Sequence, residues 1–407
     1  MIRSLVIPIS LWIGAGSVTL VEAEPPTVQT HEKRSEDGVE AAIHFRNLQS
    51  WHSRQTDARQ ARQARRTEWM EALGLDLAFT YDSLAMGAVA ADDAWGGASG
   101  DATLNLRWQI IDDDHSAPLS LNARARHRHA YSEFAPSTLK SSTGAFWGYV
   151  DGFTDAGFQV PEFFFEDRLF DRRLTLRYGQ MSIDDLLDGH ELRSAKRSFM
   201  NQAFSSSPAV GFPSSDLGFV GRWQSLNHWD FTLAVSNVAG SNLRETTDWK
   251  LDSGALFEAV QLGHDFTGLA DRASRVQLLV WRSDALPEED LDSGRGVSLT
   301  YEQSLSQSSR LFLKYAWADG RAATTLHFAS AGYARDFSVV DRAGIALATG
   351  QSSSVHKNWQ GILEVFYRRQ IGSSWMITPD LQLAAGDHLG GDRNWVVIAG
   401  LRVGVAF

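Results

Sequence analysis

The chain contains no cysteine, which excludes disulfide cross-links, thiolate catalysis and zinc sites built on cysteine ligands. It also has no excess of basic residues, because 38 Lys and Arg stand against 49 Asp and Glu, and the formal net charge is −11. No general positive field would therefore attract nucleic acid, and we expect no nucleic-acid partner.

Enzyme motifs are missing as well. The sequence has no G-x-x-x-x-G-K phosphate loop, no G-x-S-x-G nucleophile turn and no H-E-x-x-H zinc motif. The acidic stretch 184–191 offers oxygen ligands of the kind that Ca²⁺ prefers, but its spacing does not fit an EF-hand loop. We expect a solvated loop there, no metal site, no cofactor and no enzymatic activity.

Long hydrophobic runs are confined to the N-terminus. Arg3 precedes the apolar stretch 5–20, and Val21-Glu22-Ala23 places small residues where signal peptidase cuts. The alternative is a membrane anchor helix, but polar residues and glycines interrupt the run before it reaches the ~20 apolar residues that a span requires. Residues 1–23 are therefore predicted to be a secretory signal peptide.

Residues 24–72 have a different composition. The first part, 24–43, is rich in Pro, Glu and Thr and reads as a flexible leader, whereas 44–72 has no Pro or Gly and carries many arginines. This second part predicts a polar helix before the first strand, either a periplasmic extension, a plug at a barrel mouth or a solvated helix without a partner.

From Leu73 onwards the hydrophobic pattern has a period of two. Leu75, Leu77 and Phe79, for example, alternate with Asp76 and Ala78. Strict alternation of this kind predicts strands with one apolar and one polar face. The clear segments lie at 73–82, 103–110, 119–126, 172–180, 217–226, 229–239, 274–283, 296–304, 309–318, 359–370, 375–385 and 394–407, and weaker ones lie at 160–168, 255–266, 325–337 and 342–349. We expect about sixteen strands.

The length and faces of these segments indicate a membrane barrel and not a soluble sandwich. Several arginines share the polar register, while Leu, Val, Tyr and Trp fill the apolar one over the ~9–11 residues that a tilted strand needs to cross a bilayer. A sheet in lipid has to close so that every backbone group is paired. Links also alternate between short ones, such as 225–228, 305–308 and 372–374, and long ones at 132–159, 181–216 and 284–295. Residues 73–407 are therefore predicted to form a 16-stranded antiparallel transmembrane β-barrel in the outer membrane of a Gram-negative cell.

The last predicted strand ends in an aromatic residue. Val403, Val405 and the terminal Phe407 continue the apolar register to the end of the sequence. A C-terminal Phe after such a strand resembles the signal that the bacterial barrel-assembly machinery recognises. We therefore expect this machinery as a partner, with outer-membrane lipid and lipopolysaccharide as the surroundings.

Three parts of the predicted barrel carry motifs of one known family. They are the opening stretch Trp69 with Gly74–Tyr81; the central stretches Leu176–Met181 and Phe199–Phe204, with Gln202 where Asn is frequent; and the closing hairpin Leu363–Arg368 with Trp375–Gln382, which keeps P-D-x-Q. Residues 67–407 resemble the OprB family of carbohydrate-selective porins on these motifs. The resemblance implies a porin for passive diffusion of sugars. The usual tryptophan–glycine opening motif is degraded here. This departure argues against a classical glucose specificity more than against the fold.

Charged residues of the polar register are the candidates for the pore lining. Arg124, Arg126 and Arg128 lie two apart on one strand, so they share one face, and placing that face in lipid would cost about 2–4 kcal/mol for each arginine. Glu364 and Asp380 are predicted as opposing charges. Guanidinium groups donate to sugar hydroxyls and carboxylates accept from them, although all these groups would equally keep any lumen wet. The predicted pore-lining residues are Arg107, Arg124, Arg126, Arg128, Arg177, Lys314, Glu364, Arg368, Asp380 and Arg402.

Aromatic residues divide into two groups. Most tryptophans at strand ends are expected to form the interfacial girdle. Phe146, Trp147 and Tyr149 instead lie in a long predicted loop between glycines. If that loop folds inward, their rings could stack on sugars; the alternative is that they pack within the loop.

Other functions remain open from the sequence alone. A general or anion-biased porin would use the same arginines, and a barrel component of a polysaccharide export pathway could dock a partner on the leader helix. A hydrolase embedded in the barrel is disfavoured because no His-x-Ser pair of that kind occurs. The expected oligomeric state is a monomer or a homotrimer.

Overall fold

The computed structural model of the protein describes residues 70, 73–88, 95–111, 118–238, 254–338, 340–372, 374–390 and 393–406. The predicted signal peptide, nearly all of the leader and polar helix, and Phe407 lie outside the described residues. Within the described ranges, no helix is both long enough and apolar enough to cross a membrane.

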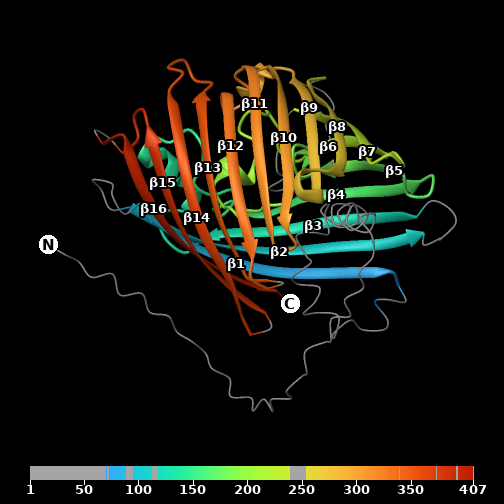
Figure 1. Cartoon of the computed structure of the whole chain (residues 1–407), viewed down its shortest axis with the longest axis horizontal. Coiled ribbons are helices and arrows are strands. Elements are labelled where there is room, and N and C mark those ends of the chain that lie inside the picture. The colour runs from blue at the N-terminus through green and yellow to red at the C-terminus, as the bar shows by residue number, and fades with distance from the viewer. Residues whose placement is uncertain are drawn as a thin grey trace, which may run out of the picture. The chain divides into compact units, whose positions relative to one another are not determined.

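Sixteen antiparallel strands close into a barrel (Figure 1). They are β1 (Leu75–Ala88), β2 (Trp95–Ile111), β3 (Leu119–Ala130), β4 (Gly157–Leu169), β5 (Leu174–Met181), β6 (Asp216–Gln224), β7 (Trp229–Asn237), β8 (Leu256–Thr267), β9 (Ala273–Ser283), β10 (Gly294–Ser306), β11 (Ser309–Gly320), β12 (Thr325–Asp336), β13 (Arg342–Ser352), β14 (Trp359–Ile371), β15 (Trp375–Gly386) and β16 (Trp395–Ala406). Each strand pairs with the next, and β16 returns to pair with β1. The predicted fold class and all the predicted strand segments, weak ones included, are confirmed.

Alternation sets the two faces of the wall, as β11 illustrates. Leu313, Tyr315 and Trp317 are exposed on the outside, while Lys314 and Ala316 between them point inward and are buried. Large apolar side chains recur in this way on the outside of the strands, where a bilayer would cover them. Trp223, Trp229, Trp375 and Trp395 are exposed at or near the ends of their strands, the positions expected for the girdle.

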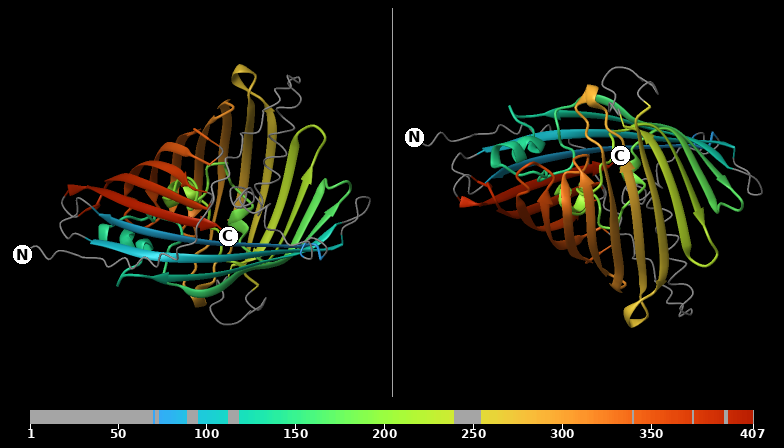
Figure 2. Two further views of the ribbon diagram at one scale, coloured as in Figure 1. Left: turned by 90° about the horizontal axis from the view of Figure 1, so that it is seen from below. Right: turned by 90° about the horizontal axis from the view of Figure 1, so that it is seen from above.

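Two long links fold into the barrel (Figure 2). The β3–β4 loop (131–156) contains η3 (Pro136–Thr138) and α4 (Leu139–Thr143), and the β5–β6 loop (182–215) contains η4 (Ile183–Asp185) and α5 (Gln202–Ser205). The remaining short helices are η5 (Leu269–Asp271) and η6 (Pro287–Glu289). Links at the other end of the barrel are short, such as the two residues between β10 and β11. The alternation of short turns and long loops is confirmed.

Apolar residues on the inner wall hold these loops. One buried cluster packs Trp147 and Tyr149 of the β3–β4 loop and Phe199 of the β5–β6 loop against strands β11 to β16 and β1. A second cluster packs the β5–β6 loop, through residues such as Ile183 and Leu187, against strands between β4 and β11. The inner face is therefore not polar throughout, because loops that enter the barrel bury apolar surface against its wall.

Candidate functional site in the barrel interior

Arg124 on β3 joins the barrel wall to the β5–β6 loop. Its Nη1 lies 2.8 Å from Glu162 Oε1 on β4 and 3.1 Å from Asp185 Oδ2 in the loop, and its Nε donates to Asn105 Oδ1 at 3.0 Å. The side chain is buried because these three partners cover it. Arg124 therefore faces inward, as predicted, and fixes one edge of the loop.

The next two arginines of β3 converge on Asp101 of β2. Arg128 Nε lies 2.9 Å from Asp101 Oδ2, and Arg126 Nε lies 3.8 Å from the same oxygen. Lys196 of the β5–β6 loop contacts Asp101 Oδ1 at 2.9 Å and Asp82 Oδ2 of β1 at 3.1 Å. The carboxylate of Asp101 is almost fully buried, whereas the side chains of the three cations are 16–26% exposed. Three partly accessible cations thus surround two buried carboxylates on this part of the wall.

Glu364 and Asp380 do not oppose these arginines. The two carboxylate oxygens of Glu364 accept from the amides of Met200 at 2.6 Å and Asn201 at 3.0 Å. Gln382 donates to Asp380 Oδ1 at 2.9 Å and accepts from Asn201 Nδ2 at 2.9 Å. The predicted opposition is wrong because Glu364 binds the β5–β6 loop directly and Asp380 contacts it only through Gln382, while the β3 arginines meet acids of the neighbouring strands and of η4.

Lys314 of β11 also binds this loop. Its Nζ lies 2.5 Å from Asp188 Oδ2, 3.0 Å from the carbonyl oxygen of Asp188 and 2.8 Å from Ser207 Oγ. Both charged side chains are almost fully buried. A buried ion pair is stable only when its contacts offset the free-energy cost of removing both charges from water, and the three contacts of Lys314 serve this purpose.

Arg368 and Arg402 complete the ring of contacts around the loop. Arg368 Nη1 donates to the carbonyl oxygen of Arg197 at 2.9 Å, and Arg402 donates to the carbonyl oxygens of Ala195 and Ser198. Glu364, Asp380, Lys314, Arg368 and Arg402 therefore point inward but are buried beneath loops. The prediction that they line free lumen is corrected on this point: Glu364, Lys314, Arg368 and Arg402 anchor the β5–β6 loop, and Asp380 supports Gln382, which binds the loop at Asn201.

A further charged group lies on β4 and β5. Arg177 contacts Glu166 Oε2 at 2.7 Å and Arg168 contacts Glu166 Oε1 at 2.8 Å, so one buried carboxylate serves two arginines. Arg107 on β2 is half-buried and donates to Gln109 at 3.3 Å. For Arg107, Arg126 and Arg128 the pore-lining role stays a prediction, whereas Arg177, like Arg124, is buried in its ion pair.

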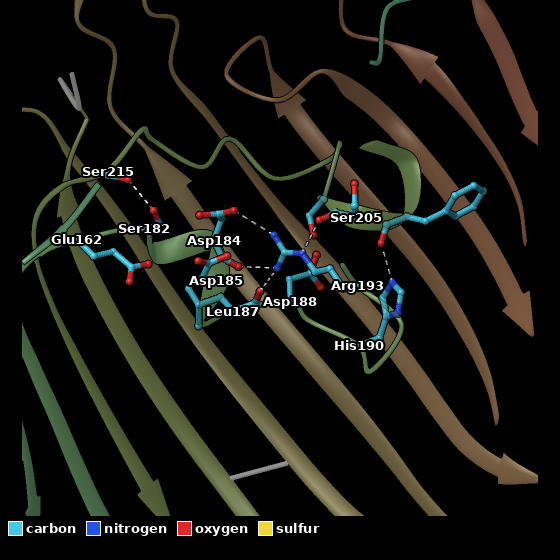
Figure 3. Close-up of polar contacts among 12 residues, drawn as sticks. Glu162, Ser182, Asp184, Asp185, Leu187, Asp188, His190, Arg193, Ser205 and Ser215 are labelled. Carbon is cyan, nitrogen blue, oxygen red and sulfur yellow. Dashed lines mark hydrogen bonds and ion pairs between the residues drawn. The ribbon is translucent and has the colours of Figure 1, made fainter. Parts of the chain in front are cut away.

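Arg193 organises the β5–β6 loop itself (Figure 3). It donates to the carbonyl oxygens of Asp184, Leu187 at 2.9 Å and Ser205 at 3.0 Å, and its Nη2 lies 3.3 Å from Asp184 Oδ2. One guanidinium thereby joins the start of the loop to α5. No sequence signal pointed to this residue, because a loop arginine belongs to no periodic pattern.

His190 is enclosed in the same loop. Its Nε2 lies 3.0 Å from the carbonyl oxygen of Phe204, and its ring stacks on Phe312 of β11 with centroids 3.9 Å apart. Burial, together with the nearby positive charges of Lys314 and Arg193, lowers the pKa of His190 well below its usual range. The imidazole is therefore neutral and donates from Nε2.

The acidic stretch 184–191 is not a solvated loop, contrary to expectation. Asp184 pairs with Arg193, Asp185 with Arg124 and Asp188 with Lys314 inside the barrel. In the described part of the chain, no group of three His or acidic residues is arranged to hold a metal ion. These acids form ion pairs because the loop packs against basic residues of the wall, Arg124 and Lys314, and carries Arg193 itself.

The aromatic residues of the β3–β4 loop are packed away from the lumen. Trp147 and Tyr149 are each 1% exposed, and Phe146 packs on the same cluster. Tyr149 shares a hydrogen bond with Thr143 Oγ1 at 3.0 Å, and burial raises the pKa of its phenol to about 12. The hypothesis that these rings stack on sugars is wrong for Trp147 and Tyr149, since their faces are covered.

Comparison with known proteins was informative only at the level of structure. No protein-family model and no curated protein sequence matches the chain. A high-pH structure of OprB from Pseudomonas putida is 12% identical with a TM-score of 0.68, and the match covers 85% of this chain and 97% of that one. An anion-selective porin from Comamonas acidovorans (10% identical, TM-score 0.53, 82% and 99% covered) and OmpT from Vibrio cholerae in its trimer form (9%, 0.52, 82% and 99%) are also similar. The chain therefore has the 16-stranded barrel fold of porins of the OprB type.

Proposed function

We propose that the protein is an outer-membrane porin through which sugars and other small hydrophilic solutes diffuse passively, without catalysis and without a cofactor. The observation that carries this proposal is a closed barrel, apolar outside and charged inside, whose interior is narrowed by two anchored loops. A barrel with an apolar exterior fits a bilayer, and a constricted polar interior admits only small hydrated solutes.

Sugar passage is supported by the kind of groups left accessible inside. Arg126, Arg128 and Lys196 are partly exposed, and each has several N–H donors for hydroxyl oxygens. Their partner Asp101 fixes these cations against the wall. An uncharged solute that passes them can therefore replace its hydrogen bonds to water with hydrogen bonds to these groups at a small cost in free energy. The sequence resemblance to carbohydrate-selective porins supports the same solute class.

The second candidate is an anion-biased porin, and the same residues favour it. Three cations there face two carboxylates, and one of the structurally similar proteins is an anion-selective porin. Reversal potentials across a salt gradient separate the two functions. A strong anion preference with no sugar flux would support the second candidate.

Liposome swelling tests the proposal directly. Proteoliposomes containing the folded protein should swell in pentoses and hexoses and more slowly in disaccharides, because the anchored loops restrict the opening. Swelling equal to that of protein-free liposomes in all sugars would overturn the proposal.

Membrane lipid, lipopolysaccharide and the barrel-assembly machinery are the proposed partners, the last through Phe407.

A further inference from the structure

The outside of the barrel is apolar along strands β8, β9 and β10, which lie side by side in the wall (Figure 1). Exposed apolar side chains form two rows that cross the three strands in register. These rows are Val260–Val280–Val297 and Leu262–Leu278–Leu299. Acyl chains of a bilayer fit such a surface.

The next outward row on these strands is charged. Glu258 on β8, Arg282 on β9, Arg295 on β10 and Asp319 on β11 are neighbours in register. Arg282 is the next outward residue after Val280, and it lies directly before the end of β9 and the long β9–β10 link (284–293). Long links face the cell exterior in barrels of this type, so the charged row lies where the outer leaflet of the membrane meets water.

The two arginines occupy the centre of this row, and an acid flanks each of them. Arg282 Nε contacts the carboxylate of Glu258, and Arg295 Nη2 lies 3.3 Å from Asp319 Oδ2. The four side chains are 38–74% exposed. Exposed ion pairs contribute little free energy, so each guanidinium can take a further anion at small cost.

Arg282 and Arg295 lie directly opposite each other on neighbouring strands. Like charges in this arrangement destabilise a sheet, and an anion bound between them removes the repulsion. A phosphate group suits the position because guanidinium groups bind phosphate oxygens through paired hydrogen bonds. Outward rows near the long links elsewhere carry no charge, as in Gly361–Ala385–Trp395 on β14 to β16. The arginine pair is therefore a local feature of β9 and β10.

The surroundings favour a phosphate carried by a lipid over free phosphate. The β9–β10 link contains Asp284, Glu288, Asp290 and Asp292, and Asp292 pairs with Arg321 at 3.0 Å. This acidic link repels a free anion that approaches from water. A lipid phosphate is instead held at the membrane boundary by its acyl chains, which lie on the apolar rows.

We propose that Arg282 and Arg295 bind a phosphate group of lipid A, the membrane anchor of lipopolysaccharide, on the outside of the barrel. One phosphate accepts hydrogen bonds from both guanidinium groups, and acyl chains of the same molecule lie against Val280 and Val297. Lipopolysaccharide is the phosphate-bearing lipid of the outer leaflet, which is the leaflet that the charged row faces. The proposal rests on the proposed outer-membrane location but not on the passage of any solute.

Native mass spectrometry of the folded protein in detergent, with added lipid A, tests the site. The wild type should bind lipid A, and Arg282→Gln/Arg295→Gln should bind it about tenfold more weakly or worse, because two charge-assisted contacts to phosphate are lost. Arg335→Gln/Arg369→Gln is the matched control, since it removes two exposed arginines near the ends of β12 and β14 that face the short links. The control should bind lipid A as the wild type does. Equal binding by the wild type and Arg282→Gln/Arg295→Gln would overturn the proposal.

Three further ligands test the role of the phosphate. Lipid A stripped of its phosphates should bind the wild type about tenfold more weakly or worse. Neither phosphatidylglycerol nor inorganic phosphate should displace lipid A at equal concentration. Undiminished binding of the stripped lipid, or displacement by either competitor, would contradict the assignment to lipid A.

A variant of the flanking acids should have the opposite effect. Glu258→Gln/Asp319→Asn should bind lipid A more tightly than the wild type, because both acids compete with phosphate for the same guanidinium groups. Unchanged or weaker binding would count against the site. All these substitutions lie outside the barrel, so each variant should keep wild-type conductance and heat-modifiable mobility. A wild-type protein that binds lipid A but conducts nothing would refute the porin function and leave the lipid site standing.

Discussion

Replacing Glu364 with alanine should release the β5–β6 loop from the barrel wall. The carboxylate is fully buried and accepts from the amides of Met200 and Asn201, so the substitution leaves two buried N–H groups without acceptors. Each unsatisfied buried donor costs about 1–3 kcal/mol, which makes about 2–6 kcal/mol for both. Because 1.4 kcal/mol is a factor of ten, the displaced state of the loop should gain population by about 30-fold at the lower end of this range.

Two measurements report on this displacement. Single-channel recordings of Glu364→Ala should show a higher mean conductance with frequent current fluctuations, and protease should cleave within residues 182–215 of the folded barrel. Ser298→Ala on β10 is the control, because it removes an inward hydroxyl that has no hydrogen-bond partner. Wild-type conductance, noise and cleavage in Glu364→Ala would refute the assignment of Glu364 as a loop anchor.

Three further predictions follow from the interior contacts. The double variant Arg124→Ala/Arg126→Ala should raise conductance and shift the reversal potential towards cations, because two positive charges leave while their acidic partners remain; an unchanged potential contradicts this. Because the pKa of His190 is lowered in the docked loop, the displaced loop binds a proton below pH ~6.5 and the docked loop does not. Docking is therefore stable above this pH and weakens as the pH falls. Protease cleavage of the loop should rise from pH 8 to pH 5, and it should rise less in His190→Phe. Gly144 ends α4 at φ 78°, where a Cβ would lie 2.4 Å from the His388 carbonyl oxygen. Gly144→Ala should therefore destabilise the β3–β4 loop by about 1–2 kcal/mol or more. Equal protease resistance of this variant and the wild type would contradict this.

The strands could be predicted because lipid and water impose alternation on each strand separately. In β11 the exposed Leu313 and Tyr315 and the buried Lys314 between them carry this information within three residues. The weaker segment 342–349 follows the same alternation, and it corresponds to β13. A local pattern of this kind needs no knowledge of which residues meet in space.

The packing of the loops could not be predicted in this way. The contact between Glu364 and Met200 joins residues 164 positions apart, and no periodicity relates them. The inward Phe312 and Phe366 look like exceptions to the polar register until the loop residue Phe199 is seen to pack on them. Where loops pack on the barrel wall, the residues that bind them therefore cannot be identified from the alternation within the strands.

Two correct pairings were nevertheless accessible from the sequence. Consecutive strands of a meander are neighbours, so the acids nearest to the arginines of β3 should come from β2 and β4. Arg124 is indeed in register with Glu162, and Arg128 with Asp101. Glu364 and Asp380 lie on β14 and β15, which are not neighbours of β3, and the predicted opposition is wrong for that reason.

The most direct test of the proposed porin function is a single-channel recording of the purified wild-type protein in planar lipid bilayers. A passive pore narrowed by the β3–β4 and β5–β6 loops should open in discrete, ohmic steps, and added hexose should lower the step conductance while it occupies the constriction. Heat-modifiable, folded protein that inserts into the bilayer but shows no conductance steps would contradict the account.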